Sequence, residues 1–114
     1  MTTNIHGTGI ELTDAIKTYA EEKMESLTKF FDNIQQINID VGKRSNHHHK
    51  GEIFYAEVNL HIPGHMLRVV KEEPDLYKAI NKVKDHLKVE LENIKEKMRG
   101  KDKEELRGAK QYQE

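Results

Sequence analysis

The chain contains no cysteine and no tryptophan, and only two of its 114 residues are proline. The absence of cysteine excludes a disulfide framework, thiolate catalysis and cysteine-ligated metal. Long apolar runs are also missing, since a stretch such as Met66 to Val70 is far too short to span a bilayer. The N-terminus lacks the basic region and apolar stretch of a secretory signal. We therefore expect a cytoplasmic protein with no membrane role.

The charge of the chain is large in amount but balanced in sign. Charged residues make up 34% of the sequence, and 19 Lys and Arg against 20 Asp and Glu give a net charge of -1. Nucleic-acid-binding domains are usually basic overall, so any RNA-binding surface here must be a local cluster of cations. The length leaves room for one domain and one modest core, so function must reside on the surface.

The N-terminal third predicts a strand followed by a helix. Asn4 to His6 read as a short strand closed by Gly7 to Gly9, and Thr13 offers a hydroxyl cap for a helix that runs to about Phe31. At 100° per residue one face of this helix gathers the apolar residues Ile16, Ala20, Met24, Leu27 and Phe31. That face is expected to pack on a sheet.

The middle of the chain predicts three consecutive antiparallel strands. Apolar residues alternate with polar ones around Ile37 to Val41 and again from Phe54 to Ile62. A polar loop, Ser45 to Gly51, separates these two strands. The dipeptide Pro63-Gly64 predicts a tight turn into a further strand through Leu67 and Val69.

A long amphipathic helix is predicted after the strands. Pro74 suits its first turn, and Asp75 complements the positive end of the helix dipole. Its apolar stripe consists of Leu76, Ala79, Ile80, Val83, Leu87, Leu91, Ile94 and Met98. We expect Gly100 to end the helix. Residues 100–114 are charged and poor in apolar residues, so we predict an α+β domain over residues 1–99 and a flexible tail over residues 100–114.

The predicted order is β-α-β-β-β-α, an α+β fold with two helices packed on one face of a four-stranded sheet. In general appearance this is like a double-stranded-RNA-binding domain. The other face of the sheet is expected to stay exposed.

Three segments in this order resemble the short ribosome hibernation-promoting factors, also called the ribosome-associated inhibitor A or sigma-54 modulation protein family. They are Glu11–Asp32 (ELTDAIKTYAEEKMESLTKFFD), Glu57–Gly64 (EVNLHIPG) and Asp75–Val83 (DLYKAINKV). The likeness covers residues 4 to about 99. It implies a non-catalytic inhibitor that docks in the decoding region of the small ribosomal subunit, contacts its ribosomal RNA and occludes messenger and transfer RNA when growth stops.

The resemblance also implies where RNA is bound, because in this family the basic surface lies on the helices and adjoining strand ends. On one flank of the second helix the family usually shows Lys or Arg, and this chain has His86, Val89 and Asn93 instead. Helical spacing places Lys84, Lys88, Lys95 and Arg99 on the opposite flank. The predicted RNA-binding residues are Lys23, Lys29, Lys43, Arg44, Lys78, Lys82, Lys84, His86, Lys88 and Lys95.

Alternative interpretations exist for the second helix and for Tyr77. The second helix can be an ordinary solvated helix whose lysines are paired, Asp85 with Lys88 and Glu92 with Lys95. Tyr77 can stack on a base or cover the edge of the core.

Other site chemistries receive little support. His47 to His49 lie together in a loop, but adjacent loop residues rarely converge on one ion, so we expect a solvated or phosphate-facing loop rather than a metal site. No phosphate loop or nucleophile elbow is present in the sequence. We predict no enzymatic activity, no cofactor and a monomer in solution.

Two rival functions remain open. The exposed sheet face, carrying Ile53, Tyr55, Met66, Arg68 and Val70, suits a protein-interaction adaptor. A general double-stranded-RNA binder is the other, and it predicts binding to bare duplex RNA.

Overall fold

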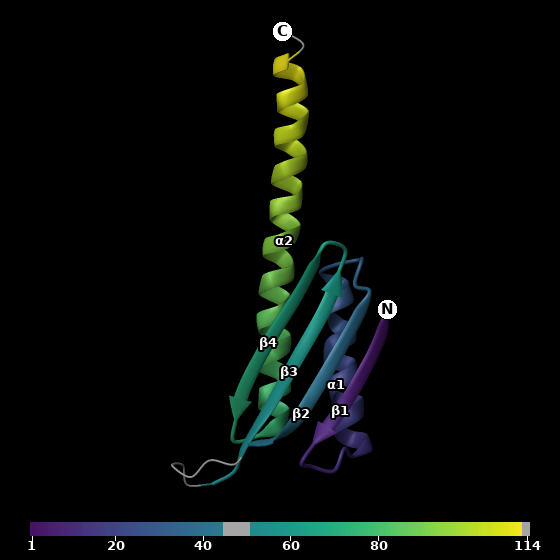
Figure 1. Cartoon of the computed structure of the whole chain (residues 1–114), viewed down its shortest axis with the longest axis vertical. Coiled ribbons are helices and arrows are strands. Elements are labelled where there is room, and N and C mark those ends of the chain that lie inside the picture. Colours follow the sequence, from purple (N-terminus) through teal and green to yellow (C-terminus); the bar gives the residue numbers. More distant parts are fainter. Residues whose placement is uncertain (45–50, 113–114) are drawn as a thin grey trace.

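The fold is a four-stranded sheet covered on one face by two helices (Figure 1). The computed structural model describes residues 1–44 and 51–112, with side chains described no further than Arg99. The elements are β1 Thr2–Thr8, α1 Asp14–Glu25, the 3-10 helix η1 Ser26–Lys29, β2 Gln36–Arg44, β3 Ile53–Ile62, β4 His65–Glu73 and α2 Leu76–Tyr112. The predicted fold class and element order are confirmed.

The sheet is mixed, with strand order β1-β2-β3-β4. The three strands β2, β3 and β4 are antiparallel, as predicted, whereas β1 pairs with β2 in parallel, Thr2 lying opposite Gln36. β1 is also longer than the predicted Asn4 to His6, because Gly7 and Thr8 still pair with Val41 and Gly42. A parallel neighbour requires a crossover, and here the crossover is made through α1 and η1.

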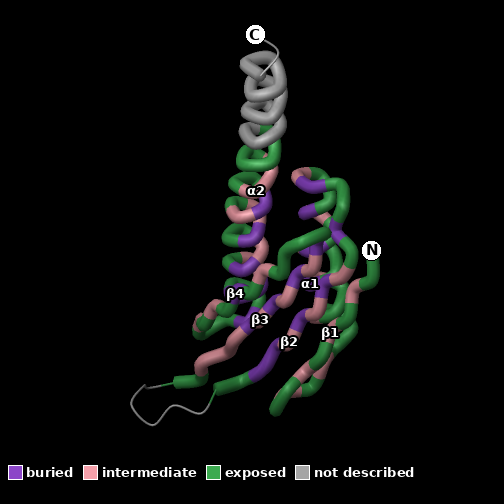
Figure 2. Tube along the Cα trace, turned by 45° about the horizontal axis from the view of Figure 1, so that its top comes forward, coloured by how far each residue is buried: buried purple, intermediate pink, exposed green. Residues whose placement is uncertain are grey.

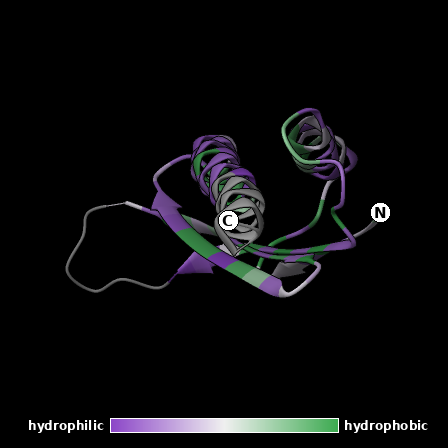
Figure 3. Ribbon diagram, turned by 90° about the horizontal axis from the view of Figure 1, so that it is seen from above, coloured by the Kyte–Doolittle hydropathy of each residue, from purple (hydrophilic) through white to green (hydrophobic). Residues whose placement is uncertain are grey.

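The core lies between the sheet and the helices. Ile37, Ile39 and Val41 are buried while Asn38 and Asp40 between them remain half-exposed, so β2 turns alternate residues toward the helices. Figure 2 shows the buried positions along the inner side of both helices and the central strands. Seen end-on, both helices lie on the same side of the sheet (Figure 3). The opposite face carries no covering element among the residues that the structure describes.

The first helix begins as predicted and ends earlier. The backbone N–H of Ile16 donates to the Thr13 hydroxyl at 3.2 Å, which confirms the cap. α1 stops at Glu25 instead of continuing to Phe31, because two hydroxyls compete for backbone carbonyls: Ser26 Oγ donates to Lys23 O at 2.6 Å and Thr28 Oγ1 to Glu25 O at 2.7 Å. The chain tightens there into η1, yet Leu27 and Phe31 still reach the core.

The second helix differs from the prediction at both ends. It begins at Leu76, with the Asp75 carboxylate accepting the N–H of Tyr77 at 2.9 Å, so Pro74 precedes the helix rather than occupying its first turn. Gly100 does not end the helix, which continues to Tyr112. A glycine in a helix interior costs only about 1 kcal/mol, and residues 101–107 are mostly strong helix formers in sequence. Within the described part of the chain, no helix combines the length and the apolar character needed to cross a membrane.

Candidate nucleic-acid interface

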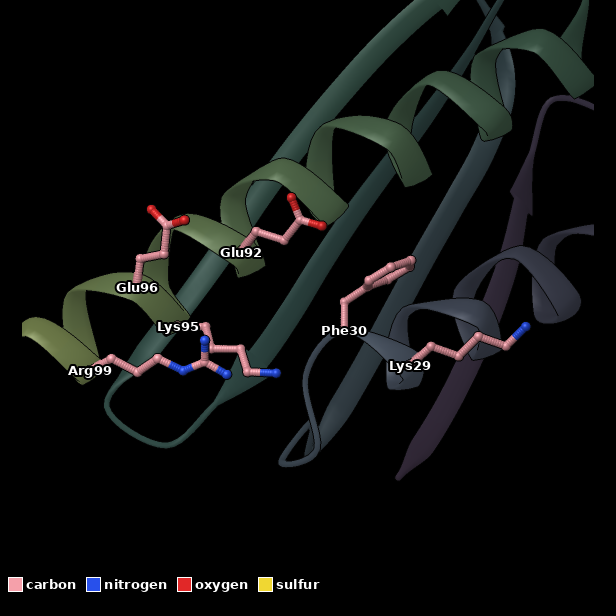
Figure 4. A pocket seen from close by; sticks show the side chains of 6 residues that line it. All are labelled: Lys29, Phe30, Glu92, Lys95, Glu96 and Arg99. Atoms are coloured by element: carbon pink, nitrogen blue, oxygen red, sulfur yellow. The ribbon is translucent and has the colours of Figure 1, made fainter.

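A groove runs between η1 and the middle of α2, and cations border it on both sides. Lys29, Phe30, Glu92, Lys95, Glu96 and Arg99 line a hollow of about 240 Å³ there (Figure 4). In Figure 4 the side chains of Lys95 and Arg99 extend from α2 toward Phe30, the Glu96 carboxylate points away from them, and the Lys29 side chain points out of the groove on the η1 side. Lys95 and Arg99 therefore present their positive charges to the groove.

One further lysine is held at this groove by an aromatic ring. The Nζ atom of Lys88 lies 4.5 Å from the centroid of the Phe30 ring, in cation–π geometry. This contact holds the ammonium group of Lys88 over the groove without neutralising it, because a ring carries no net charge. Lys84 lies one turn earlier on the same flank of α2. We call the set Lys29, Lys84, Lys88, Lys95 and Arg99 the groove cations.

The groove cations are largely free of acidic partners. Among the ion pairs of the described residues, only Lys84 is engaged, with its neighbour Asp85 at 2.6 Å. The two pairs expected for a merely solvated helix, Asp85 with Lys88 and Glu92 with Lys95, are not among them. The groove therefore keeps a surplus of positive charge, which is the electrostatic requirement for holding a phosphate backbone.

Of the predicted cations, Lys29, Lys88 and Lys95 are thus brought together at the groove, whereas Lys23 packs against a ring of its own helix. Lys23 Nζ sits 5.3 Å from the centroid of the Tyr19 ring, and Tyr19 in turn packs edge-on against Tyr77 at 4.9 Å between centroids. Tyr77 therefore connects α1 to the start of α2, and 39% of the residue stays exposed. Base stacking and covering of the core edge both stay predictions for this side chain.

The remaining predicted cations lie elsewhere and are mostly paired. Lys43 pairs with Glu52, and Arg44 Nε lies 3.2 Å from Glu72 Oε1 while its guanidinium stacks on Tyr55 at 4.7 Å. Both belong to the end of β2, at the other end of the sheet from η1 (Figure 1).

On the β4-facing side of α2, two predicted residues are also paired. Lys82 pairs with Glu73, and His86 Nε2 lies 3.4 Å from Glu90 Oε1. Lys78 is exposed on the outer side of the helix. The loop histidines His47 to His49 lie outside the described residues, and no group of three metal-ligating side chains occurs in the part that is described.

Sequence reasoning missed Phe30, and it noted Arg99 without including it in the site. The signal for Phe30 was the pair Phe30-Phe31 at the end of a helix. Helical geometry lets only one of two adjacent residues face the core, and Phe31 is the buried one.

The open sheet face has a different electrostatic character. Asp40 accepts hydrogen bonds from Thr8 Oγ1 at 2.9 Å and from the Tyr55 hydroxyl at 3.0 Å, and Arg68 pairs with Glu57 at 2.6 Å. Partial burial raises the pKa of Tyr55 above 10.0, and the nearby Asp40 charge raises it further, although the Thr8 hydroxyl and Arg44 oppose the shift. The charged groups of this face mostly satisfy one another.

Gly42 lets the Tyr55 ring lie across the open sheet face. A Cβ atom at Gly42 would come within 2.5 Å of the Thr8 carbonyl oxygen and 2.6 Å of the Tyr55 ring. The bare glycine is therefore what allows Tyr55 to reach Asp40 from the neighbouring strand.

Curated proteins of similar sequence are named for ribosome hibernation. The ribosome hibernation promoting factor of Klebsiella oxytoca is 32% identical over 101 residues, which cover 87% of this chain and 98% of that protein. The ribosome hibernation promotion factor of Deinococcus radiodurans is 29% identical over 93 residues, and the match covers 80% of this chain but 47% of that protein. The chain thus spans about half the length of some of its relatives.

A solved structure shares the fold. The ribosomal subunit interface protein from Coxiella burnetii superposes with a TM-score of 0.72 over 83% of this chain and 98% of its own, at 22% sequence identity. The family described as sigma 54 modulation protein / S30EA ribosomal protein matches residues 3–99, which include all of α1 and every strand residue except Thr2. These are ribosome-associated factors and not enzymes, and the chain belongs to this family.

Proposed function

We propose that the protein is a cytoplasmic translation inhibitor of dormant cells that docks in the decoding region of the small ribosomal subunit. There it contacts ribosomal RNA through the groove cations and occludes messenger and transfer RNA. The single observation that carries this proposal is the surplus of cations between η1 and α2 that have no acidic partner among the described residues. Family membership supports it, since relatives are named for ribosome hibernation.

The physical logic is that blocking a channel requires affinity and shape but no base reading. Lys and Arg gain affinity from the release of counterions condensed on the phosphate backbone, and this gain is nearly independent of sequence. A rigid wedge of sheet and helices, held by such contacts, excludes other occupants sterically. No group in the proposal performs a covalent step.

The domain over residues 1–99 is proposed to act as a monomer, with residues 100–114 contributing to what happens after docking. The family match covers residues 3–99, so the C-terminal segment lies beyond it.

Sedimentation of the full chain with purified small subunits, across a salt series, tests the proposal. Association is expected to be strong at low salt and to weaken steeply with salt, and bound protein is expected to prevent initiator transfer RNA from binding a programmed subunit. Absence of co-sedimentation at low salt contradicts ribosome binding. Binding that leaves transfer RNA undisturbed contradicts the decoding-region location, and equal affinity for bare duplex RNA favours a general RNA binder.

A further inference from the structure

The two edges of the sheet differ in what they expose. On the β1 edge, the residues of the open face are Thr2, Asn4, His6 and Thr8, all polar, and Ile5 is turned to the core. On the β4 edge, Met66 is 57% exposed and Val70 is 37% exposed on the open face. Proteins normally protect an edge strand with charge, proline or a bulge. Arg68 and Lys71 supply charge on this strand, yet Met66 and Val70 leave apolar surface exposed beside them.

An apolar hollow adjoins the same edge on the helix side. His65, Leu67, Glu90, Ile94, Lys97 and Met98 line a groove of about 440 Å³ between β4 and α2, and Met98 within it is 40% exposed. The edge at His65 to Val70 therefore has apolar side chains both above and below the plane of the sheet. Its outer backbone groups have no strand partner within the described part of the chain.

The charges around this edge define the kind of partner. Lys71 and Lys97 take part in none of the ion pairs found among the described residues, while the nearby acids Glu57 and Glu73 are each paired with a cation. Glu90 lies 3.4 Å from His86, which offsets its charge only when the histidine is protonated. The edge therefore combines exposed apolar side chains with two lysines that have no acidic partner in the described part of the chain. If β4 paired with a second copy of itself symmetrically about Arg68, the two Arg68 side chains would face each other. No acidic residue would then lie opposite Lys71.

We propose that the β4 edge binds an extended, acidic segment of a partner protein, which adds to the sheet as a further strand. Backbone hydrogen bonds to β4 supply affinity, as in other cases of strand addition. Apolar side chains of the segment pack on Met66 and Val70 on one face and enter the Leu67, Ile94 and Met98 groove on the other. Acidic residues lie opposite Arg68 and Lys71. This surface lies apart from the groove cations, so it is separate from the proposed function.

A labelled synthetic peptide tests this directly. The proposed partner segment has acidic residues opposite Arg68 and Lys71 and apolar residues at its other positions. The acetylated hexapeptide Glu-Val-Val-Glu-Val-Val has this pattern. Fluorescence anisotropy with the full chain is expected to show saturable binding, and hydrogen exchange is expected to slow at the amides of β4 but not of β1. Replacing both glutamates of the peptide by lysine is expected to weaken binding at least tenfold.

Two matched variants locate the site. Met66→Glu is expected to weaken peptide binding about tenfold, whereas Val89→Glu, which changes an apolar side chain of similar exposure (53%) on the outer side of α2, is expected to change it less than twofold. Lys97→Gln, a mild exposed change, is expected to weaken binding about threefold. Thermal unfolding confirms that each variant is folded, and Met66→Glu is expected to retain ribosome co-sedimentation.

The proposal is overturned if Met66→Glu and Val89→Glu bind the peptide equally, or if exchange at β4 is unchanged at saturation. It is also overturned if the protein sediments as a dimer that Met66→Glu dissociates, since the occupant of the edge is then a second copy.

Discussion

The helix side and the open sheet side of this molecule carry similar kinds of charged residue in opposite states of engagement. On the open sheet face, Arg44, Arg68 and Asp40 are held by partners on neighbouring strands. In the groove, Lys88, Lys95 and Arg99 face a ring and open space. The difference teaches that a chain with a net charge of -1 can still present a local cluster of unpaired cations to a polyanion.

The largest expected effect comes from removing the free cations. The quadruple variant Lys29→Gln, Lys88→Gln, Lys95→Gln and Arg99→Gln is expected to lose ribosome affinity by about a hundredfold at about 0.1 M salt, because several counterion-releasing contacts disappear. The slope of log affinity against log salt should shrink by about one unit for each phosphate that the variant no longer neutralises. Co-sedimentation over a salt series measures the affinity and its salt dependence. An unchanged slope would show that the groove cations do not contact the phosphate backbone.

On the open sheet face, a change in packing is expected to lower the stability of the fold without changing ribosome affinity. Gly42→Ala places a Cβ atom against the Thr8 carbonyl and the Tyr55 ring, and overpacking of this kind costs about 1–3 kcal/mol. Denaturant unfolding measures the loss of free energy. At temperatures where the variant is folded, its ribosome affinity should match that of the unchanged chain, and a large drop would mean that the two faces are not independent.

Tyr55 allows the sheet face to be tested by pH. Burial raises the pKa of the folded Tyr55 above its usual value of 10.0, so the native state holds the phenol proton more tightly than the unfolded chain does. The resulting stability is fully present below pH 10 and is lost as the pH rises through the folded pKa. Tyr55→Phe should remove this alkaline loss, and unfolding measured from neutral pH to above pH 10 compares the two. Equal pH dependence in both proteins would contradict the assignment.

The smallest effect sharpens the comparison inside α2 itself. Lys88→Gln removes an unpaired cation and is expected to weaken ribosome binding by a few-fold, whereas Lys82→Gln removes a cation already paired with Glu73 and should change it less than twofold. Both positions are on the same helix and carry the same residue type. Equal effects would show that pairing in the free protein does not decide which lysines bind RNA.

The sequence was sufficient for the elements whose signal is local. Alternation around Ile39 and Val58 marked the buried strands, and Thr13 marked the start of α1, because each depends on residues close in the chain. Helix ends were less accessible. The end of α1 depends on hydroxyl bonds from Ser26 and Thr28, and α2 continues through Gly100 because one glycine costs less than the helix around it supplies.

The sequence predicted which cations could belong to the candidate site, but not which of them are unpaired in the fold. Which lysines are free depends on contacts between distant segments, such as Lys82 with Glu73 on β4 and Lys88 with Phe30 after η1. Helical spacing alone cannot show that one flank of α2 faces an acid-bearing strand while the other faces an aromatic ring. The role of individual lysines in RNA binding therefore stays a prediction for the variants above.

The parallel pairing of β1 sets an order of events during synthesis. β3 and β4 are separated only by the Pro63-Gly64 turn, so they can form a hairpin as soon as they emerge, whereas β1 has no partner until Gln36 to Gly42 have been made. β1 is therefore synthesised before its partner strand. Pairing it with β2 is a long-range step that local structure cannot accelerate. A newborn chain would expose the edge of β2 until its own N-terminus returned to cover it.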